Sequence, residues 1–217
     1  MIFKTKMEIP NSNIYEDVPE EELLPKKELL SNIDFLDENL DLTFSFEGAE
    51  EILPEITDED LNNDQERFRI LLGELVQLSE NKVNIEIKGI LEVPDENEEK
   101  RRLYSEEKGE ISYNIKNIKD YVKELQEVNP KIKNWHFVGD IHTHSLRQSD
   151  LSDWQKTRNC SPTDYEFLCR AYNEGRLSPD EPYIFGIGGR DGKETVYSFY
   201  RVFIKDGHYR VEEITGV

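Results

Sequence analysis

Alternating hydrophobic and polar positions predict β-strands through most of the chain. In "LDLTFSF", residues 40–46, every second side chain is apolar, as expected for a strand with one buried face. The segments 66–78 and 83–93 are also rich in apolar residues, and the polar "SENK" between them predicts a hairpin. Further strands are predicted at 134–141, at 182–189 and, as a pair joined by "KDG", within 195–214.

Apolar residues three or four positions apart predict helices between these strands. Residues 114–128 have this spacing and are followed by an Asn-Pro pair, which stops a helix. Residues 161–175 begin with Ser161 at the N-cap, Pro at the first helical position and Asp164 at the capping-box position. The acidic segment 49–56 has helical spacing as well, interrupted by a proline.

The order of these elements predicts a mixed β-sheet flanked by helices, which is an α/β fold of α+β sandwich-like arrangement. Residues 94–110 are charged and predict a loop. Residues 39–217 are long enough to bury one hydrophobic core and are expected to form one domain. Residues 1–38 are strongly acidic, which predicts a partly disordered extension. Such an extension either binds a protein partner or forms a solvated tail.

The charge of the chain argues against two classes of partner. The 217 residues carry a net charge of −20, with 34% of them charged. Nucleic-acid phosphates and anionic lipids both require clustered Lys and Arg, so neither nucleic acid nor a membrane is an expected partner.

The cysteine spacing and the lengths of the apolar segments bear on the cellular location of the protein. Nine helical residues would hold Cys160 and Cys169 about 13 Å apart, which is too far for a disulfide. The sequence has no apolar run of membrane-spanning length, and its first residues lack the apolar core of a signal peptide. We therefore expect a cytoplasmic protein with reduced thiols.

The stretch "GDIHTHS", residues 139–145, contains two of the four histidines of the chain. His142 and His144 lie one residue apart at the end of a predicted strand, so both imidazoles are expected within reach of one cation. Imidazole is the commonest metal ligand in proteins. The pair therefore predicts a metal site.

Several hydrolase families begin their metal site with such a pair, including the PHP phosphoesterases and the amidohydrolases. Both are barrels that need further histidines, whereas His208 is the only histidine after His144. A three-ligand zinc site needs one more ligand and an open position for water. Asp164 is the best candidate, because it lies in the first turn of a helix, one turn from the hydroxyl of Ser161.

These motifs, in this order, resemble those of the JAMM (MPN+, JAB1-type) metalloprotease family. The matching pieces are "ERFRILLG" from Glu66, "HTH" from His142 and "SPTD" from Ser161. The resemblance covers residues 40–217 and implies the MPN/JAB architecture, which is cytidine-deaminase-like.

The resemblance also implies a role for each matching residue. His142, His144 and Asp164 would bind one zinc ion per chain. Glu66 would be the general base that accepts a proton from the metal-activated water. Ser161 would stabilise the oxyanion of the tetrahedral intermediate. The implied reaction is hydrolysis of an isopeptide or peptide bond, usually after the C-terminus of a ubiquitin-like or small carrier protein.

Alternatives to this assignment stay open at several points. Glu86, in "EIKGIL", also precedes a glycine in an apolar strand and is the second candidate for the base. The family usually has Pro where Ser145 stands, and we expect the long loop 145–160 to shape substrate choice, with Trp154 as a candidate substrate contact. The functional alternatives are a catalytically silent MPN-type interaction scaffold and a JAMM-like hydrolase of small peptide or amino-acid adducts.

Other polar and aromatic residues near these motifs are expected to be structural. Asp140 is predicted to support the strand, and His136 to face a helix or solvent. Trp135 and Tyr165 are predicted to lie in the core.

Overall fold

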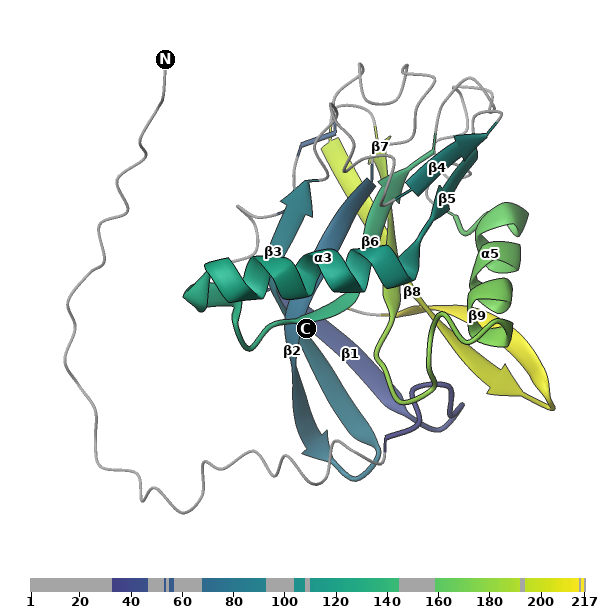
Figure 1. The fold of residues 1–217 in the computed structure, drawn as a ribbon. Coiled ribbons are helices and arrows are strands. Elements are labelled where there is room, and N and C mark those ends of the chain that lie inside the picture. Colours follow the sequence, from purple (N-terminus) through teal and green to yellow (C-terminus); the bar gives the residue numbers. More distant parts are fainter. Residues whose placement is uncertain are drawn as a thin grey trace, which may run out of the picture.

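The computed structural model describes residues 33–46, 53, 55–56, 68–92, 104–107, 110–144, 159–191, 194–214 and 216. Figure 1 shows the arrangement of their helices and strands. The strands are β1 (Asp41–Phe46), β2 (Phe68–Ser79), β3 (Lys82–Glu92), β4 (Tyr104–Glu107), β5 (Glu110–Tyr113), β6 (His136–Thr143), β7 (Ile184–Asp191), β8 (Glu194–Lys205) and β9 (His208–Ile214). The helices are α3 (Ile115–Val128) and α5 (Pro162–Asn173), with a short 3-10 helix, η4 (Pro130–Ile132).

Seven of these strands form one mixed sheet, so the predicted mixed α/β class is confirmed. The strand order is β1-β3-β2-β6-β7-β8-β9. The pairs β1–β3 and β6–β7 are parallel, and the other neighbours are antiparallel. Strand β6, which carries the two histidines, therefore lies in the middle of the sheet. The predicted hairpin of β2 and β3 is also present.

Both described helices pack on the same face of this sheet (Figure 1). The apolar side of α3 packs on β2, with Ile118 and Val122 against Ile70 and Leu72. The apolar side of α5 packs on β7 and β8 through a cluster that includes Leu168. Helix α5 begins with the predicted capping box, which satisfies backbone N–H groups that a helix start otherwise leaves unpaired.

The opposite face of the sheet curls around a core of its own. Residues of β1, β3, β6 and β8 meet in this core. The ring centroids of Phe44 and Phe199 lie 4.5 Å apart there. Two isolated parallel bridges bring together distant parts of the chain, Asp37 with Ile204 and Phe44 with Gly216. The curl thus brings β1 close to the β8–β9 end of the sheet.

A β-bulge in β6 decides which residues face the helices. In the pairing with β2, Gly139 is opposite Leu71, but the next partner, Leu72, is opposite Phe137. Val138 is the extra residue, and it lies in the core opposite the helices together with Ile141. The bulge therefore interrupts the alternation of the strand and turns Asp140 and His142 toward the helical side.

Gly139 makes this bulge sterically feasible. Its φ is +148°, and a Cβ at this position would lie 1.7 Å from the carbonyl oxygen of Ile184 on the neighbouring strand. No side chain larger than hydrogen fits in that space. The glycine of "GDIHTHS" is thus required for the close approach of β6 and β7.

Some predictions are wrong or lie outside the described residues. The region predicted as a loop at 94–110 contains β4, which pairs with β5 in a separate two-stranded sheet. The prediction failed because this charged segment lacks the alternating apolar residues that indicate a strand. Tyr165 is 36% exposed rather than buried, since its side of α5 faces solvent and its hydroxyl reaches the carbonyl of Tyr209. The predicted extension 1–38 is described only from residue 33, and the predicted helix at 49–56 is described only at residues 53, 55 and 56.

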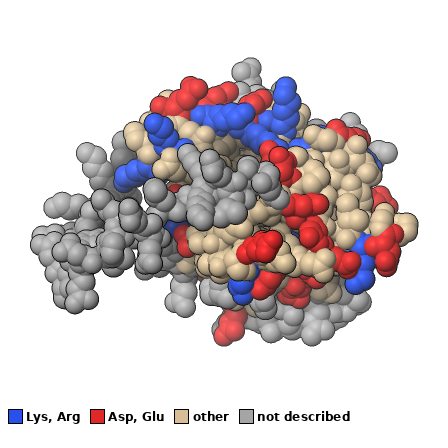
Figure 2. Space-filling view, turned by 90° about the horizontal axis from the view of Figure 1, so that it is seen from below, with Lys and Arg blue, Asp and Glu red and all other residues tan. Residues whose placement is uncertain are grey.

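Charged side chains of both signs lie on the described surface. On the face in Figure 2, many Lys and Arg lie toward one border, together with Asp and Glu, and further Asp and Glu are spread over the rest. Among the described helices, neither is long and apolar enough to cross a membrane.

We expect Gly139→Ala to lower the free energy of unfolding by more than about 3 kcal/mol, because backbone atoms of β7 must move to admit the methyl group. Gly207→Ala is the matched control. Gly207 also has a positive φ, +74°, but a Cβ there meets nothing within 4 Å. Its substitution should cost about 1 kcal/mol, the conformational term alone. Urea denaturation of both variants measures the difference, and equal costs would show that the contact with Ile184 is unimportant.

Candidate metal centre

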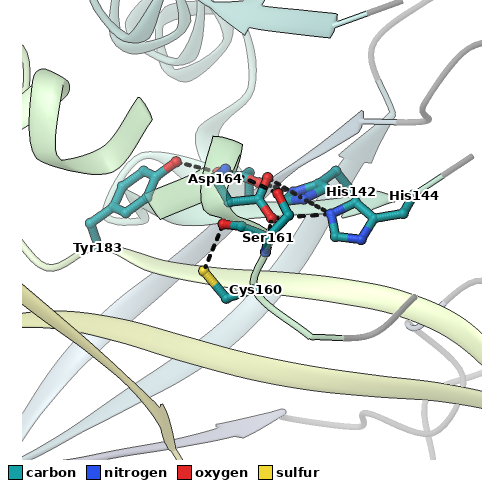
Figure 3. Close-up of polar contacts among 7 residues, drawn as sticks. His142, His144, Cys160, Ser161, Asp164 and Tyr183 are labelled. Carbon is teal, nitrogen blue, oxygen red and sulfur yellow. Dashed lines mark hydrogen bonds and ion pairs between the residues drawn. The ribbon is translucent and has the colours of Figure 1, made fainter. Parts of the chain in front are cut away.

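His142 and His144 are presented by the end of β6. Strand residues two positions apart point to the same face, so the two imidazoles lie side by side (Figure 3). Their ring centroids are 5.2 Å apart, and their Nε2 atoms are 3.3 Å apart. His142 is buried, whereas the side chain of His144 is 15% exposed.

Asp164 approaches the same point from the first turn of α5. Its Oδ2 accepts a hydrogen bond from the backbone N–H of Ser161 at 2.7 Å, and its own N–H donates to the Oγ of Ser161 at 3.1 Å. These two bonds form the capping box, and they also fix the direction of the carboxylate. Oδ2 lies 3.1 Å from Nε2 of His144, and Oδ1 lies 3.4 Å from Nε2 of His142.

The spacing of these three donors fits a metal ion. One ligand atom from each of His142, His144 and Asp164 can be chosen so that all lie within 4.8 Å of one another. A tetrahedral ion with bonds of about 2.0–2.1 Å holds its ligand atoms about 3.3 Å apart. The two Nε2 atoms are 3.3 Å apart, and each lies within 3.4 Å of one oxygen of Asp164, Oδ2 for His144 and Oδ1 for His142. Two imidazoles and one carboxylate are also a donor set typical of zinc enzymes.

Electrostatics at the centre favours positive charge. Burial alone would lower the pKa of His142, but the carboxylates of Asp164 and Asp140 outweigh it and hold this pKa well above 6.5. Burial alone would raise the pKa of Asp164, but His142 and His144 outweigh it and hold the pKa well below the usual range. Both pKa shifts have the same cause, the attraction between the protonated imidazoles and the ionised carboxylates. A bound cation would replace the proton of His142 in this negative environment.

Asp140 is a part of the centre whose role the sequence analysis did not predict. It is 2% exposed, and its Oδ1 lies 3.2 Å from Nδ1 of His142, the ring nitrogen that faces away from Asp164. Tyr183, directly before β7, donates its hydroxyl to the other carboxylate oxygen of Asp140. Alternation along the strand would have placed Asp140 beside His142, but Tyr183 could be found only from the pairing of β6 with β7.

Cys160 lies next to the capping box but is not in the group of described residues that could share a metal ion. Burial, reinforced by Asp164, raises the pKa of the Cys160 thiol to about 12. Without a metal ion, the thiol therefore stays protonated near neutral pH. Its Sγ contacts the carbonyl oxygen of Ser161 at 3.6 Å. Both cysteines are free in the structure.

Of the other predicted site residues, the structure places only Ser161 at the centre. Ser161 lies beside Asp164 at the N-cap of α5 (Figure 3). Glu66, Ser145 and Trp154 lie outside the described residues. Strand β2 begins at Phe68, which pairs with His142, so the start of this strand lies at the histidine end of β6.

Glu86, the second candidate for the base, lies elsewhere. It pairs with Glu74 of β2, beyond Gly73, whose partner on β6 is His136. Six residues of strand from His136 to His142 correspond to about 20 Å. Glu86 also forms an ion pair with Lys88 at 2.9 Å. The structure therefore does not bring Glu86 to the histidines.

In metal-free protein, we expect the free energy of unfolding to fall as the pH rises above about 6.5. The folded state holds the proton of His142 more tightly than the unfolded state does. The resulting stabilisation is complete below the unfolded pKa, about 6.5, and is lost as the pH rises through the folded pKa. Denaturation in EDTA at several pH values measures this loss.

Two variants of β6 separate this effect from other titrations. His142→Gln should remove the loss of stability above pH 6.5, whereas His136→Gln, on the exposed start of the same strand, should retain it. Saturating zinc should reverse the trend in the unsubstituted protein, because deprotonated imidazole binds the metal better. An identical pH dependence in all three proteins would contradict the electrostatic account.

A comparison of the sequence with protein-family models gave no match, and neither did a comparison with curated proteins. The geometry of this centre is therefore the observation from which a function can be inferred. Within the described residues, that observation is a group of two histidines and one aspartate that could hold a metal ion.

Proposed function

We propose that the chain is a zinc-dependent hydrolase of the JAMM type, which cleaves an isopeptide or peptide bond after a ubiquitin-like or small carrier protein. One observation carries the proposal: two imidazoles and one carboxylate, from two different elements, each offer a ligand atom within 4.8 Å of the others. The Nε2 atoms of the two histidines lie 3.3 Å apart, close to the separation of ligands on tetrahedral zinc. Zinc bound there would act as a Lewis acid and would make water nucleophilic near neutral pH.

The partial exposure of the centre supports catalysis over a purely structural ion. Structural zinc sites are usually closed by four protein ligands, whereas catalytic sites keep an open position. Here three ligands are found among the described residues, and the side chains of His144 and Asp164 are 15% and 17% exposed. Water and a substrate could therefore reach them from outside.

We assign the general base to Glu66. It precedes Phe68 by two residues, and Phe68 begins β2 opposite His142. In this role the Glu66 carboxylate accepts a proton from the attacking water and passes it to the nitrogen of the leaving amine.

Ser161 would stabilise the negative oxygen that develops on the substrate carbonyl. Its Oγ already accepts the N–H of Asp164, so the hydroxyl proton remains available for donation. The N-terminus of α5 adds a partial positive charge at the same place. The capping interaction thus orients the Ser161 hydroxyl so that it can donate its proton to the oxyanion.

The order of elements supports the finer MPN-type architecture within this proposal. The strand that begins beside the proposed base, β2, is a direct neighbour of the histidine strand. The helix with the "SPTD" motif then contributes its first turn to the same point. These are the relations that the resemblance of the motifs implies.

We expect Glu66→Gln to lower the rate of hydrolysis by about 10²–10⁴-fold, because the amide cannot accept the proton. Zinc content should stay at one ion per chain, since Glu66 is not a proposed ligand. The assay uses ubiquitin-like proteins extended at their C-terminus through a peptide or an isopeptide bond, with zinc measured by mass spectrometry. Glu86→Gln is the control and should retain full activity.

The outcomes separate the proposed function from its alternatives. A chain that binds zinc but cleaves only small peptide or amino-acid adducts would be a hydrolase of a different substrate class. A chain that cannot be loaded with zinc would contradict the enzyme and favour a silent scaffold. Loss of activity in Glu86→Gln but not in Glu66→Gln would contradict the assignment of the base.

A further inference from the structure

We propose that Asp140 and Tyr183 are positioning residues, which hold His142 through a buried chain of hydrogen bonds and thereby set the affinity of the centre for zinc. This inference rests on the metal site of the proposed function but not on the reaction or its substrate. It assigns a task to two residues that belong to neither the ligands nor the proposed base.

The chain of hydrogen bonds is short, buried and continuous. The hydroxyl of Tyr183 donates to Oδ2 of Asp140, and Oδ1 of Asp140 lies 3.2 Å from Nδ1 of His142. The three residues are 4%, 2% and 4% exposed, respectively. Little water can therefore compete for these groups, and the hydrogen bonds are stronger than they would be at the surface.

The carboxylate selects the form of the imidazole that can bind a metal. An ionised carboxylate only accepts hydrogen bonds, so Nδ1 of His142 must carry the proton that it donates to Asp140. In a neutral imidazole, Nε2 then has the free lone pair. This is the nitrogen that lies 3.3 Å from Nε2 of His144 and 3.4 Å from Asp164. Asp140 thus keeps the lone pair directed at the position of the ion.

Tyr183 fixes the carboxylate in turn. With one oxygen of Asp140 engaged by each partner, the carboxylate cannot rotate without losing a buried hydrogen bond. Tyr183 is itself held by Phe137, whose ring lies 5.8 Å away in an edge-to-face arrangement. The parallel pairing of Gly139 with Ile184 sets the start of β7 beside Asp140. The orientation of His142 therefore depends on two neighbouring strands.

A purely structural role explains these residues less well. Replacing buried ionic groups by well-packed apolar ones is often neutral or stabilising, so such a group is weak evidence for a contribution to stability. Partners of this kind on the second nitrogen of a metal-binding histidine typically change metal affinity by 10–100-fold. The buried carboxylate is consequently better explained by its effect on His142.

The test is the zinc affinity of the full chain, measured by competition with a chromogenic chelator. We expect Asp140→Asn to weaken zinc binding by about 10–100-fold. Asparagine keeps the size and an acceptor oxygen but removes the charge and offers an N–H group to the tyrosine hydroxyl. Tyr183→Phe, which removes a single oxygen, should weaken binding by a smaller factor. Tyr172→Phe, in the same apolar cluster, is the control and should bind zinc as tightly as the unsubstituted chain.

A double-mutant cycle distinguishes positioning from a general loss of structure. In the proposed chain of hydrogen bonds, Tyr183 acts only through Asp140. The variant with both substitutions should therefore bind zinc about as weakly as Asp140→Asn alone. The visible spectrum of the cobalt-substituted protein should also change in both single variants and stay unchanged in Tyr172→Phe. Circular dichroism confirms folding, and Tyr183→Phe remains informative if Asp140→Asn does not fold.

Two failures have different meanings. If the unsubstituted chain binds no zinc, the proposed function and this inference both fail. If it binds zinc, and Asp140→Asn and Tyr183→Phe bind zinc equally tightly with unchanged cobalt spectra, the inference alone is overturned. Independent, additive effects of the two substitutions would also overturn it, because a hydrogen-bonded chain requires coupling.

Discussion

The close approach of Gly139 to the carbonyl of Ile184 is the constraint on which the rest of the site depends. It permits the bulge that interrupts the alternation of β6. Without that bulge, the residues after it would exchange faces, and the imidazole of His142 would enter the apolar core. From Gly139 onward, β6 pairs with both of its neighbours, β2 and β7. The position of His142 at one end of the strand thus depends on the absence of a side chain three residues earlier.

Asp164 satisfies two requirements with one carboxylate. It completes the cap of α5, where a negative charge is favourable near the positive end of the helix dipole. It also supplies negative charge beside the two imidazoles. Because both interactions favour the ionised form, the helix start and the proposed metal affinity depend on the same protonation state. Local folding of the helix and organisation of the centre are therefore coupled.

The sequence showed the local parts of this structure but not the relations between distant ones. The two histidines, the capping box and the β2–β3 hairpin follow from patterns within a few residues, and each could be predicted. Tyr183 could not, because its contact with Asp140 requires knowledge of which strands are neighbours. The pairing of β4 with β5 was missed because the charged segment of β4 lacks alternating apolar residues. Tyr165 was misplaced because aromatic character alone does not tell which side of a helix is buried.

The two isolated bridges between the first and the last described residues have a consequence for the order of folding. They join Asp37 to Ile204 and Phe44 to Gly216, positions separated by nearly the whole described chain. Closing so long a loop costs conformational entropy before any contact compensates for it, which slows folding. The β2–β3 hairpin can form early, whereas the curl of the sheet must wait until residues near 216 have been synthesised. During translation, these two bridges therefore cannot form until residues 204 and 216 have left the ribosome.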